Sequence, residues 1–336
     1  MRPSSQIFHH IRLPLALVAI NVAFAAAFMG TALSAFHAPA PHALPVGIVA
    51  PAPVSHEVRD ALQAHAPGGF ALHAYATEAR ARTAIGRREV DGALVAAPGG
   101  MTLLVAQAGG SAPAQLLTNT FSGLAAKTGR HLAVVDAVPP LKDDSLALSS
   151  FFTILCVLFP SLATGAATAH VFRRHRTAWR IAVPAMAAVA IGLSATAVAA
   201  GVTGFGDYLS VAGIVALFSL SISAPTAALG RIRLPLIALA VIAFLIIGIP
   251  VSGGPAGLAP FGPGFLRALD SALPLGAAVD AVRNTIYFHA NDTAHYLWVL
   301  GAWAAAGIAL LLVHASARST LLTHYGLRLR GAYRSS

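Results

Sequence analysis

Long runs of apolar residues dominate the pattern along this chain. Crossing the hydrocarbon core of a bilayer takes about 20 consecutive apolar residues. Six segments reach that length, and the charged residues within them are limited to Arg180 and Arg233, each near the start of its segment. They are Leu13–Phe36, Leu148–Val171, Ala178–Val202, Leu209–Leu229, Ile232–Val251 and His295–Ser316. The sequence therefore predicts an α-helical polytopic membrane protein with six transmembrane helices.

The first apolar segment has a second interpretation as a cleaved signal peptide. Arg2 and Arg12 precede it and small residues follow it, as in such peptides. Its apolar stretch is about 24 residues long, whereas the apolar region of a signal peptide spans roughly 7–15 residues. An uncleaved membrane anchor is therefore the expected outcome.

Between the first and second apolar segments, residues 37–147 carry an alternating pattern of short strands and helices. A linker rich in Pro, Ala and His, His37–Pro45, opens this region. Strands are expected at Val46–Ala50, Phe70–Tyr75, Gly92–Val95, Thr102–Val105 and Leu132–Val135. Helices are expected at His56–His65, Glu78–Arg88 and Pro113–Lys127. The pattern predicts one small α/β domain on the outer, extracytoplasmic side of the membrane.

The segment 252–292 is too long to be a simple turn between two membrane helices. It predicts two short helices, Phe265–Leu273 and Leu275–Phe288, that are re-entrant or interfacial. In the second helix, apolar residues recur on one stripe, whereas Asp280, Arg283 and Asn284 lie off it. This predicts an amphipathic helix that lies at the membrane interface or packs on the bundle. Its simplest role is that of a structural lid.

Composition and charge support the membrane assignment and add an orientation. Hydrophobic residues make up 57% of the chain and charged residues 10%, against roughly 25% charged residues in soluble domains. The basic residues lie beside apolar runs, which favours a membrane over nucleic acid as the partner. Arg far outnumbers Lys and Ala is abundant, which is typical of a GC-rich bacterial genome and places the protein in a bacterial plasma membrane.

The positive-inside rule then sets the topology. With a cytoplasmic N-terminus, residues 1–12, and a cytoplasmic basic tail, residues 317–336, all 12 acidic residues fall outside. The inner segments hold only basic charges: Arg2, Arg12, Arg173, Arg174, Arg176, Arg180, Arg231, Arg233, Arg318, Arg328, Arg330 and Arg334. The region 148–316 is thus expected to be a five-helix membrane domain with both chain ends in the cytoplasm.

Motifs of enzymes are lacking, so no catalytic residue, cofactor or metal ion is expected. No phosphate-binding Gly-rich loop, His-Glu-x-x-His pair or Gly-x-Ser-x-Gly elbow occurs in the sequence. The His residues of the linker have no nearby Cys or carboxylate that would complete a metal site. Asp143 and Asp144 are adjacent, so their side chains point in different directions, and a solvated junction is expected there.

The apolar segments also lack the ionisable residues that proton- or ion-coupled transporters carry within the membrane. His170 and His314 come nearest, and both lie at predicted cytoplasmic helix ends. A transporter of this kind needs energy from elsewhere, and a separate ATPase would supply it. Small residues such as Gly165 predict close contacts between the helices.

One stretch of the sequence resembles a known family. Pro274-Leu275-Gly276-Ala277-Ala278-Val279-Asp280-Ala281-Val282-Arg283 is similar to a recurring motif of ABC-2-type permeases, in which a proline, an apolar stretch and Ala-x-Arg precede the final helix. The layout of one helix, an outer domain and five helices resembles the subgroup of the YhgE/Pip and DUF3533 membrane proteins. Pro274, Asp280 and Arg283 are the motif's polar and helix-breaking positions.

This resemblance implies the permease subunit of an ABC-type exporter, with an ATPase encoded separately. The substrate would be amphiphilic or lipid-like, and the permease a homodimer or paired with a similar subunit. In that interpretation the connection Phe172–Arg180 docks the ATPase through Arg173, Arg174, Arg176 and Trp179; the alternative is a plain positive-inside anchor. The competing hypothesis for the whole chain is a non-transporting membrane protein whose outer domain binds a cell-envelope partner or a phage.

Overall fold

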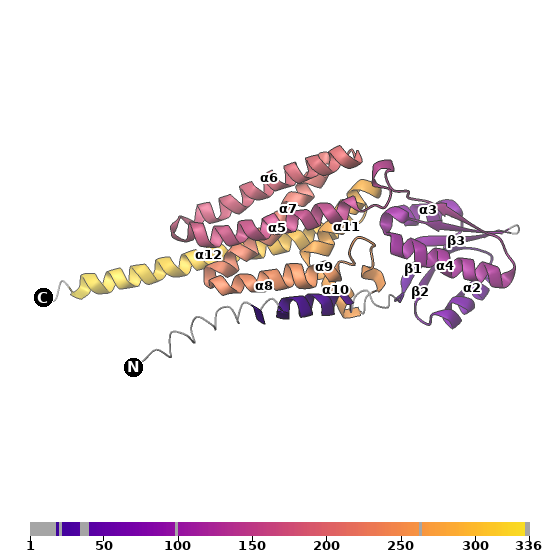
Figure 1. The fold of residues 1–336 in the computed structure, drawn as a ribbon, viewed down its shortest axis with the longest axis horizontal. Helices are drawn as coiled ribbons and strands as arrows, with labels where there is room; N and C mark the ends of the chain where they lie inside the picture. Colours follow the sequence, from indigo (N-terminus) through magenta and orange to yellow (C-terminus); the bar gives the residue numbers. More distant parts are fainter. Residues whose placement is uncertain (1–17, 20–21, 34–39, 98–99, 262–263, 333–336) are drawn as a thin grey trace.

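The protein combines a bundle of long apolar helices with a small α/β domain at one end of the bundle (Figure 1). The structure is a computed structural model that describes residues 18–19, 22–33, 40–97, 100–261 and 264–332. The α/β domain caps one end of the bundle, and α12 (Thr293–Ala332) extends beyond the other end (Figure 1). The predicted combination of a helical membrane protein with an α/β domain is confirmed at this level.

Five stretches of helix within the described residues are long and apolar enough to cross a membrane. They are Ser149–Arg174, which contains α5 (Ser149–Val171), α6 (Thr177–Thr203), α7 (Tyr208–Ile232), Leu234–Val251 and Thr293–His314 of α12. These match the last five predicted segments. The first predicted segment, Leu13–Phe36, falls partly outside the described residues, and its described part includes a shorter apolar helix, Val22–Leu33. The structure thus gives five spanning helices, and the sixth stays a prediction.

The fourth of these spans is not one regular α-helix. It runs through the 3₁₀ turn η4 (Leu234–Leu236), α8 (Ile237–Val241), the π-helical turn η5 (Ile242–Ile247) and α9 (Gly248–Val251). Pro250 has no N–H to donate to the carbonyl oxygen of Ile246 four residues earlier. The hydroxyl of Thr31 lies 3.0 Å from that oxygen. The helix Val22–Leu33 therefore contacts the bundle at the irregular turn, where its Thr31 hydroxyl donates to a backbone oxygen.

The α/β domain contains a five-stranded sheet in the order β2-β1-β3-β4-β5. The strands are β1 (Leu44–Val49), β2 (Phe70–Ala74), β3 (Gly92–Ala97), β4 (Gly100–Val105) and β5 (Leu132–Asp136). The β3–β4 pair is antiparallel and the other pairs are parallel. All five predicted strands are present, with ends displaced by one or two residues.

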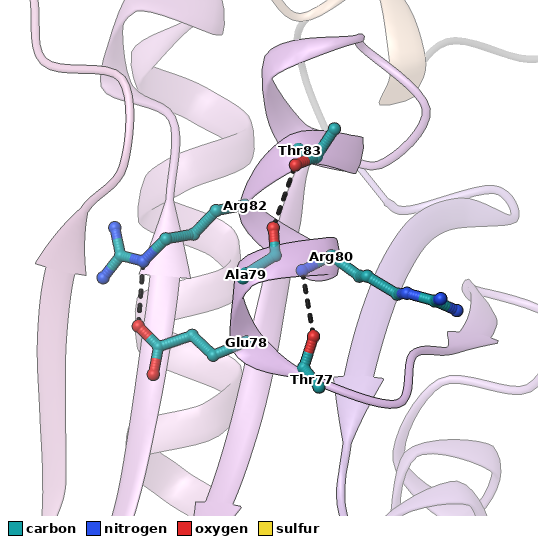
Figure 2. Close-up of polar contacts among 6 residues, drawn as sticks. All are labelled: Thr77, Glu78, Ala79, Arg80, Arg82 and Thr83. Carbon is teal, nitrogen blue, oxygen red and sulfur yellow. Dashed lines mark hydrogen bonds and ion pairs between the residues drawn. The ribbon is translucent and has the colours of Figure 1, made fainter.

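Helices cover both faces of this sheet because residues alternate between the faces along each strand. The helices α2 (Ala52–His65) and α4 (Ser111–Thr128) share a core with Val46, Ile48 and Leu103 on one face. The helix α3 (Glu78–Gly86) packs on the other face, against Ala93 and Leu104. Its start is fixed locally, since the Thr77 hydroxyl accepts from the Arg80 N–H and Arg82 pairs with Glu78 (Figure 2).

The second face of the sheet is completed by residues from the bundle side of the molecule. Tyr287 and Phe288, at the end of α11 (Pro274–Tyr287), are buried in the same cluster as Ala84 and Ile85 of α3. The α/β domain and the bundle therefore share one hydrophobic core at their junction. This shared core fixes the position of the domain relative to the helices.

The segment 252–292 forms the turn η6 (Ala259–Phe261), α10 (Gly264–Ala272) and α11. Both predicted helices are present, but α11 is not a lid at the surface. It packs against α5, α7 and α12, and its residues from Pro274 to Val279 are all buried. Its polar side is also largely shielded, because Arg283 and Asn284 are buried where the α/β domain meets the bundle. Of the two predicted settings, packing on the bundle is the one observed.

Candidate functional site

A cluster of charged side chains lies at the junction between the α/β domain and the bundle. It surrounds a cavity of about 230 Å³. Its walls come from the α3–β3 connection, residues 109–113 around the start of α4, the segment 252–260, α10, α11 and the start of α12. The lining residues are Arg88, Asp91, Gly109, Pro113, Ser252, Gly257, Ala259, Pro260, Arg267, Asp270, Asp280, Arg283 and Tyr296. Charged groups rarely lie away from water without partners, so we regard this cluster as the candidate site.

Asp280 of α11 is the centre of the cluster. Its Oδ1 accepts a hydrogen bond from Nη1 of Arg283 at 2.9 Å, and Nη2 of Arg88 lies 3.9 Å from the same oxygen. Arg88 also lies over the ring of Phe288, with its guanidinium carbon 4.9 Å from the ring centre. A residue of the α/β domain and a residue of the bundle thus share one carboxylate oxygen.

Arg283 is almost fully buried, with a side-chain exposure of 5%. Burial lowers the pKa of its guanidinium, and the ion pair with Asp280 opposes that shift. An arginine nevertheless stays protonated in proteins. Its Nε has no hydrogen-bond partner among the described residues, although the atom is shielded from solvent. A buried charged donor that is only partly satisfied is costly, and the cavity beside it offers the space for a further acceptor.

Asp270 approaches the cluster from α10. Its Oδ1 is shielded from solvent and has no hydrogen-bond partner among the described residues. Burial raises the pKa of this carboxyl to about 8; the Asp280 carboxylate adds to the shift and Arg283 opposes it. Asp270 is therefore mostly protonated at neutral pH and can act as a hydrogen-bond donor.

Asp91 supplies the third carboxyl of the cavity. It directly precedes β3, and its N–H donates to the carbonyl oxygen of Pro45 at 2.9 Å. Burial raises the pKa of Asp91; Arg88 lowers it, and Asp280 raises it further. An Asp-Gly pair such as 91–92 is typical of a turn, and the structure adds a place for Asp91 in the cavity wall.

Hydrogen bonds to backbone carbonyl oxygens hold the two parts of the molecule together around this cavity. The N–H of Ala112 donates to the carbonyl oxygen of Ala256, and Nη1 of Arg267 donates to that of His42, both at 3.0 Å. Asn291 Nδ2 donates to the carbonyl oxygen of Gly86, also at 3.0 Å. These bonds join the α/β domain to the segments that precede and follow α11.

A second polar contact ties the connection between the domain and α5 to α11. The carboxylate of Asp144 accepts from the N–H groups of Leu148 and Ser149 at the start of α5, and from the hydroxyl of Tyr287. A carboxylate at a helix N-terminus is favourable because the backbone donors there lack partners. Burial and this hydrogen bond raise the pKa of Tyr287. The expected solvated junction is therefore wrong for Asp144, which is buried and structural.

The sequence-based candidates separate into two places at opposite ends of the bundle. Pro274, Asp280 and Arg283 lie in α11 at the junction, with Pro274 as the first residue of that helix. Arg173 and Arg174 lie in the turn η3 (Phe172–Arg174), Arg176 precedes α6, and Trp179 lies in the first turn of α6. These four residues are exposed and lie at the bundle end far from the α/β domain (Figure 1).

Sequence reasoning missed Arg88, Asp91 and Asp270 as members of the site. One local feature could have pointed to Asp270. Only 12 acidic residues occur in the chain, and two of them, Asp270 and Asp280, lie close together on either side of Pro274. No group of three or more His, Cys, Asp or Glu side chains suited to a metal ion occurs within the described residues.

No family model, curated protein or solved structure matches this chain. The likeness of residues 274–283 to ABC-2-type permeases therefore stays a prediction from the sequence, and the functional argument depends on the geometry above.

Proposed function

We propose that this chain is the membrane-spanning permease subunit of an ABC-type exporter in a bacterial plasma membrane. It moves an amphiphilic or lipid-like substrate outward, with energy from a separate ATPase subunit, and acts as a homodimer or with a similar permease. The charge distribution along the spans supports this assignment. Within the five described spans, Arg173, Arg174, Arg180 and Arg231 lie near the ends, and no Asp, Glu or Lys occurs. Such a bundle has no intramembrane carboxylate to couple transport to protons.

The observation that carries the proposal is the geometry of the loop between α5 and α6. Arg180 donates to the carbonyl oxygens of Phe172, Arg173 and His175, at 3.0, 3.1 and 2.6 Å. The inward-turned Arg180 braces the loop backbone, while Arg173, Arg174 and Arg176 remain exposed. A braced loop that presents three cations and the exposed Trp179 is suited to docking a protein partner, since Arg and Trp are enriched at such interfaces.

The orientation of the molecule is part of the proposal. Among the described residues, all acidic side chains lie in the α/β domain or at the bundle end next to it. The opposite end carries Arg173, Arg174, Arg176 and Arg233 in its connections. By the positive-inside rule this basic end faces the cytoplasm, where an ATPase would bind. The α/β domain then lies outside.

Replacement of Arg173, Arg174 and Arg176 by Gln tests the docking role. The variant keeps Arg180, so the loop backbone stays braced. We expect the triple variant to stimulate the partner ATPase several-fold less than the wild type when both are reconstituted in liposomes, because each charged contact in an interface contributes on the order of 1 kcal/mol.

The matched control removes three exposed Arg residues from the α/β domain, through replacement of Arg59, Arg80 and Arg82 by Gln. This control keeps the change in net charge but leaves the loop intact. The docking role is wrong if the wild type, the loop variant and the control stimulate the ATPase equally while the α/β domain stays outside. The loop would then serve only to fix the topology.

A second candidate function draws on the α/β domain. A groove of about 460 Å³ runs between α2 and α4 and is lined by Ala61, Leu62, Ala64, His65, Asn119, Thr120, Gly123, Leu124 and Lys127. It faces away from the junction core, because α2 and α4 lie on the other face of the sheet. A non-transporting protein would use this groove for a cell-envelope or phage partner. Two results together would favour this alternative. The Asn119→Arg variant would lose binding of the partner, and the wild type would not stimulate an ATPase.

A further inference from the structure

The junction cavity has hydrogen-bonding capacity that the protein itself leaves unused. Arg283 Nε and Asp270 Oδ1 are both shielded from solvent, both line the cavity, and neither has a partner among the described residues. Arg283 is more than nine-tenths buried. Buried polar atoms are nearly always satisfied in native proteins, so a molecule that accepts from these groups is expected in the cavity.

The charge of the cavity lining favours an anion. Three guanidinium groups, of Arg88, Arg267 and Arg283, face three carboxyls. Because Asp270 is mostly protonated at neutral pH, cations outnumber carboxylates there. Guanidinium groups bind phosphate and carboxylate oxygens through charge-assisted hydrogen bonds.

The depth of the cavity in the bundle indicates where such an anion comes from. Ser252 directly follows the span that ends at Val251, and Tyr296 lies in the first turn of the span that begins at Thr293. The cavity is therefore at the level where the apolar spans end. Lipid headgroups lie at that level, and Tyr side chains are enriched there.

We propose that the junction cavity is a binding site for a phosphate group, with Arg283 of α11 and Arg88 of the α/β domain donating to its oxygens. The two guanidinium groups already converge on one oxygen of Asp280, at 2.9 and 3.9 Å, so one tetrahedral anion can bridge them. Bound phosphate joins the α/β domain to the bundle through these two residues. This binding site is independent of the proposed export function, because phosphate can bind in the cavity whether or not the protein transports a substrate.

Titration calorimetry on the full chain in a neutral detergent tests the site with two probes, inorganic phosphate and dioctanoyl phosphatidylglycerol. We expect the wild type to bind at least the lipid. Arg283→Gln and Arg88→Gln are expected to bind about tenfold more weakly or worse, as for the loss of one charge-assisted hydrogen bond. Arg82→Gln, whose side chain pairs with Glu78 (Figure 2) and does not line the cavity, is expected to bind like the wild type.

The two probes identify the source of the phosphate. Binding of both indicates a site for the phosphate group itself, and binding of the lipid alone indicates a headgroup site. No binding of either probe, or equal loss in Arg82→Gln, would overturn the proposal. If Arg283→Gln does not fold, Arg88→Gln carries the test, because Arg88 is a partly exposed residue outside the bundle core; full affinity in Arg88→Gln would then overturn it.

The pH dependence of lipid binding adds an independent readout. A phosphodiester keeps one negative charge in neutral and mildly alkaline solution, so a change in affinity reports the protein. Deprotonation of Asp270 should weaken binding as the pH rises through about 8. The groups that face Asp270 are Asp280 and Arg283 of α11, Arg88 and Asp91 of the α/β domain, Arg267 of α10 and Tyr296 of α12. Asp270→Asn should bind at every pH; an unchanged loss of affinity in this variant would overturn the role of Asp270.

Discussion

At the scale of single residues, the position of Asp270 depends on the absence of a side chain at Gly276. A Cβ atom at Gly276 would lie 1.9 Å from Oδ1 of Asp270, far closer than two such atoms can approach. The glycine therefore lets the carboxyl of α10 rest against the first turns of α11. There Asp270 reaches the neighbourhood of Asp280 and Arg283, and burial changes its protonation.

Asp270→Asn should change how stability depends on pH. The pKa of Asp270 is raised from 3.8 to about 8, so between these values the folded protein holds a proton that the unfolded chain releases. Stability from this group is lost as the pH rises from about 4 to about 8. Asn cannot ionise, so the wild type should lose a few degrees of Tm relative to the variant over that range.

Thermal unfolding in detergent at several pH values measures this difference. Asp60→Asn provides the control, because Asp60 is an exposed carboxyl on α2. Parallel pH profiles for the wild type and Asp270→Asn would show that Asp270 ionises as it does in the unfolded chain.

The sequence singled out two residues of the junction cluster and missed the rest for a physical reason. Asp280 and Arg283 are three residues apart on one helix, so their pairing is a local property. Arg88 meets them only because Tyr287 and Phe288 complete the core of the α/β domain. A contact of that kind depends on tertiary packing, which the spacing of residues along the chain does not encode.

At the scale of helices and strands, α7 is the central element of the bundle. Its neighbours approach its backbone through glycines. A Cβ atom added to Gly165 of α5 would lie 2.6 Å from the Ser223 carbonyl oxygen, and one added to Gly192 of α6 would lie 2.7 Å from that of Ala212. A Cβ atom added to Gly307 of α12 would lie 2.4 Å from the Pro225 nitrogen. Small residues allow helices in membranes to pack closely. Each of α5, α6 and α12 thus has a contact with α7 that only glycine permits.

Gly307→Ala should destabilise the packing of α12 on α7. The added methyl group would meet backbone atoms of α7, which cannot move aside as a side chain would. Overpacking of this kind costs about 1–3 kcal/mol, and Tm in detergent should fall accordingly. Gly301→Ala is the matched control, since a Cβ at Gly301 of the same helix meets no atom within 4 Å. Equal Tm values for the two variants would contradict the close α7–α12 contact.

Hydropathy was sufficient to predict five spans because apolar length is a direct requirement of the bilayer. The close contact at Gly165 also followed from composition. The irregular span did not: the π-helical turn before Pro250 and its contact with Thr31 depend on how the helix Val22–Leu33 packs on the bundle. The amphipathic stripe of α11 showed which side is apolar, but not that its polar side faces another domain.

At the scale of the whole molecule, the acidic groups gather at one end of the long axis. Among the described residues, the end that holds the α/β domain carries all the acids together with basic residues, and the connections at the other end carry exposed Arg residues and no acid. Short loops rich in basic residues generally stay in the cytoplasm during insertion, so this distribution predicts the orientation. The proposed positions of substrate, phosphate and ATPase all depend on that orientation.

Cysteine labelling in intact cells measures the orientation. The chain has one cysteine, Cys156, so single cysteines are placed in a Cys156→Ala background at the exposed positions His65 of α2 and His175 of the α5–α6 loop. A membrane-impermeant maleimide should label the first and not the second until the cells are opened. If only the loop position is labelled in intact cells, the chain has the opposite orientation and the proposed topology is wrong.

Docking of a separate ATPase on the α5–α6 loop is the step that distinguishes export from a non-transporting role. A photo-crosslinking residue at His175 tests it in cells, with the same residue at His65 as the control for non-specific capture. We expect the loop position to crosslink a protein that carries a Walker A phosphate-binding loop, and the control position to crosslink none. A correctly oriented chain that captures no ATPase at His175 would contradict the assignment as an exporter subunit.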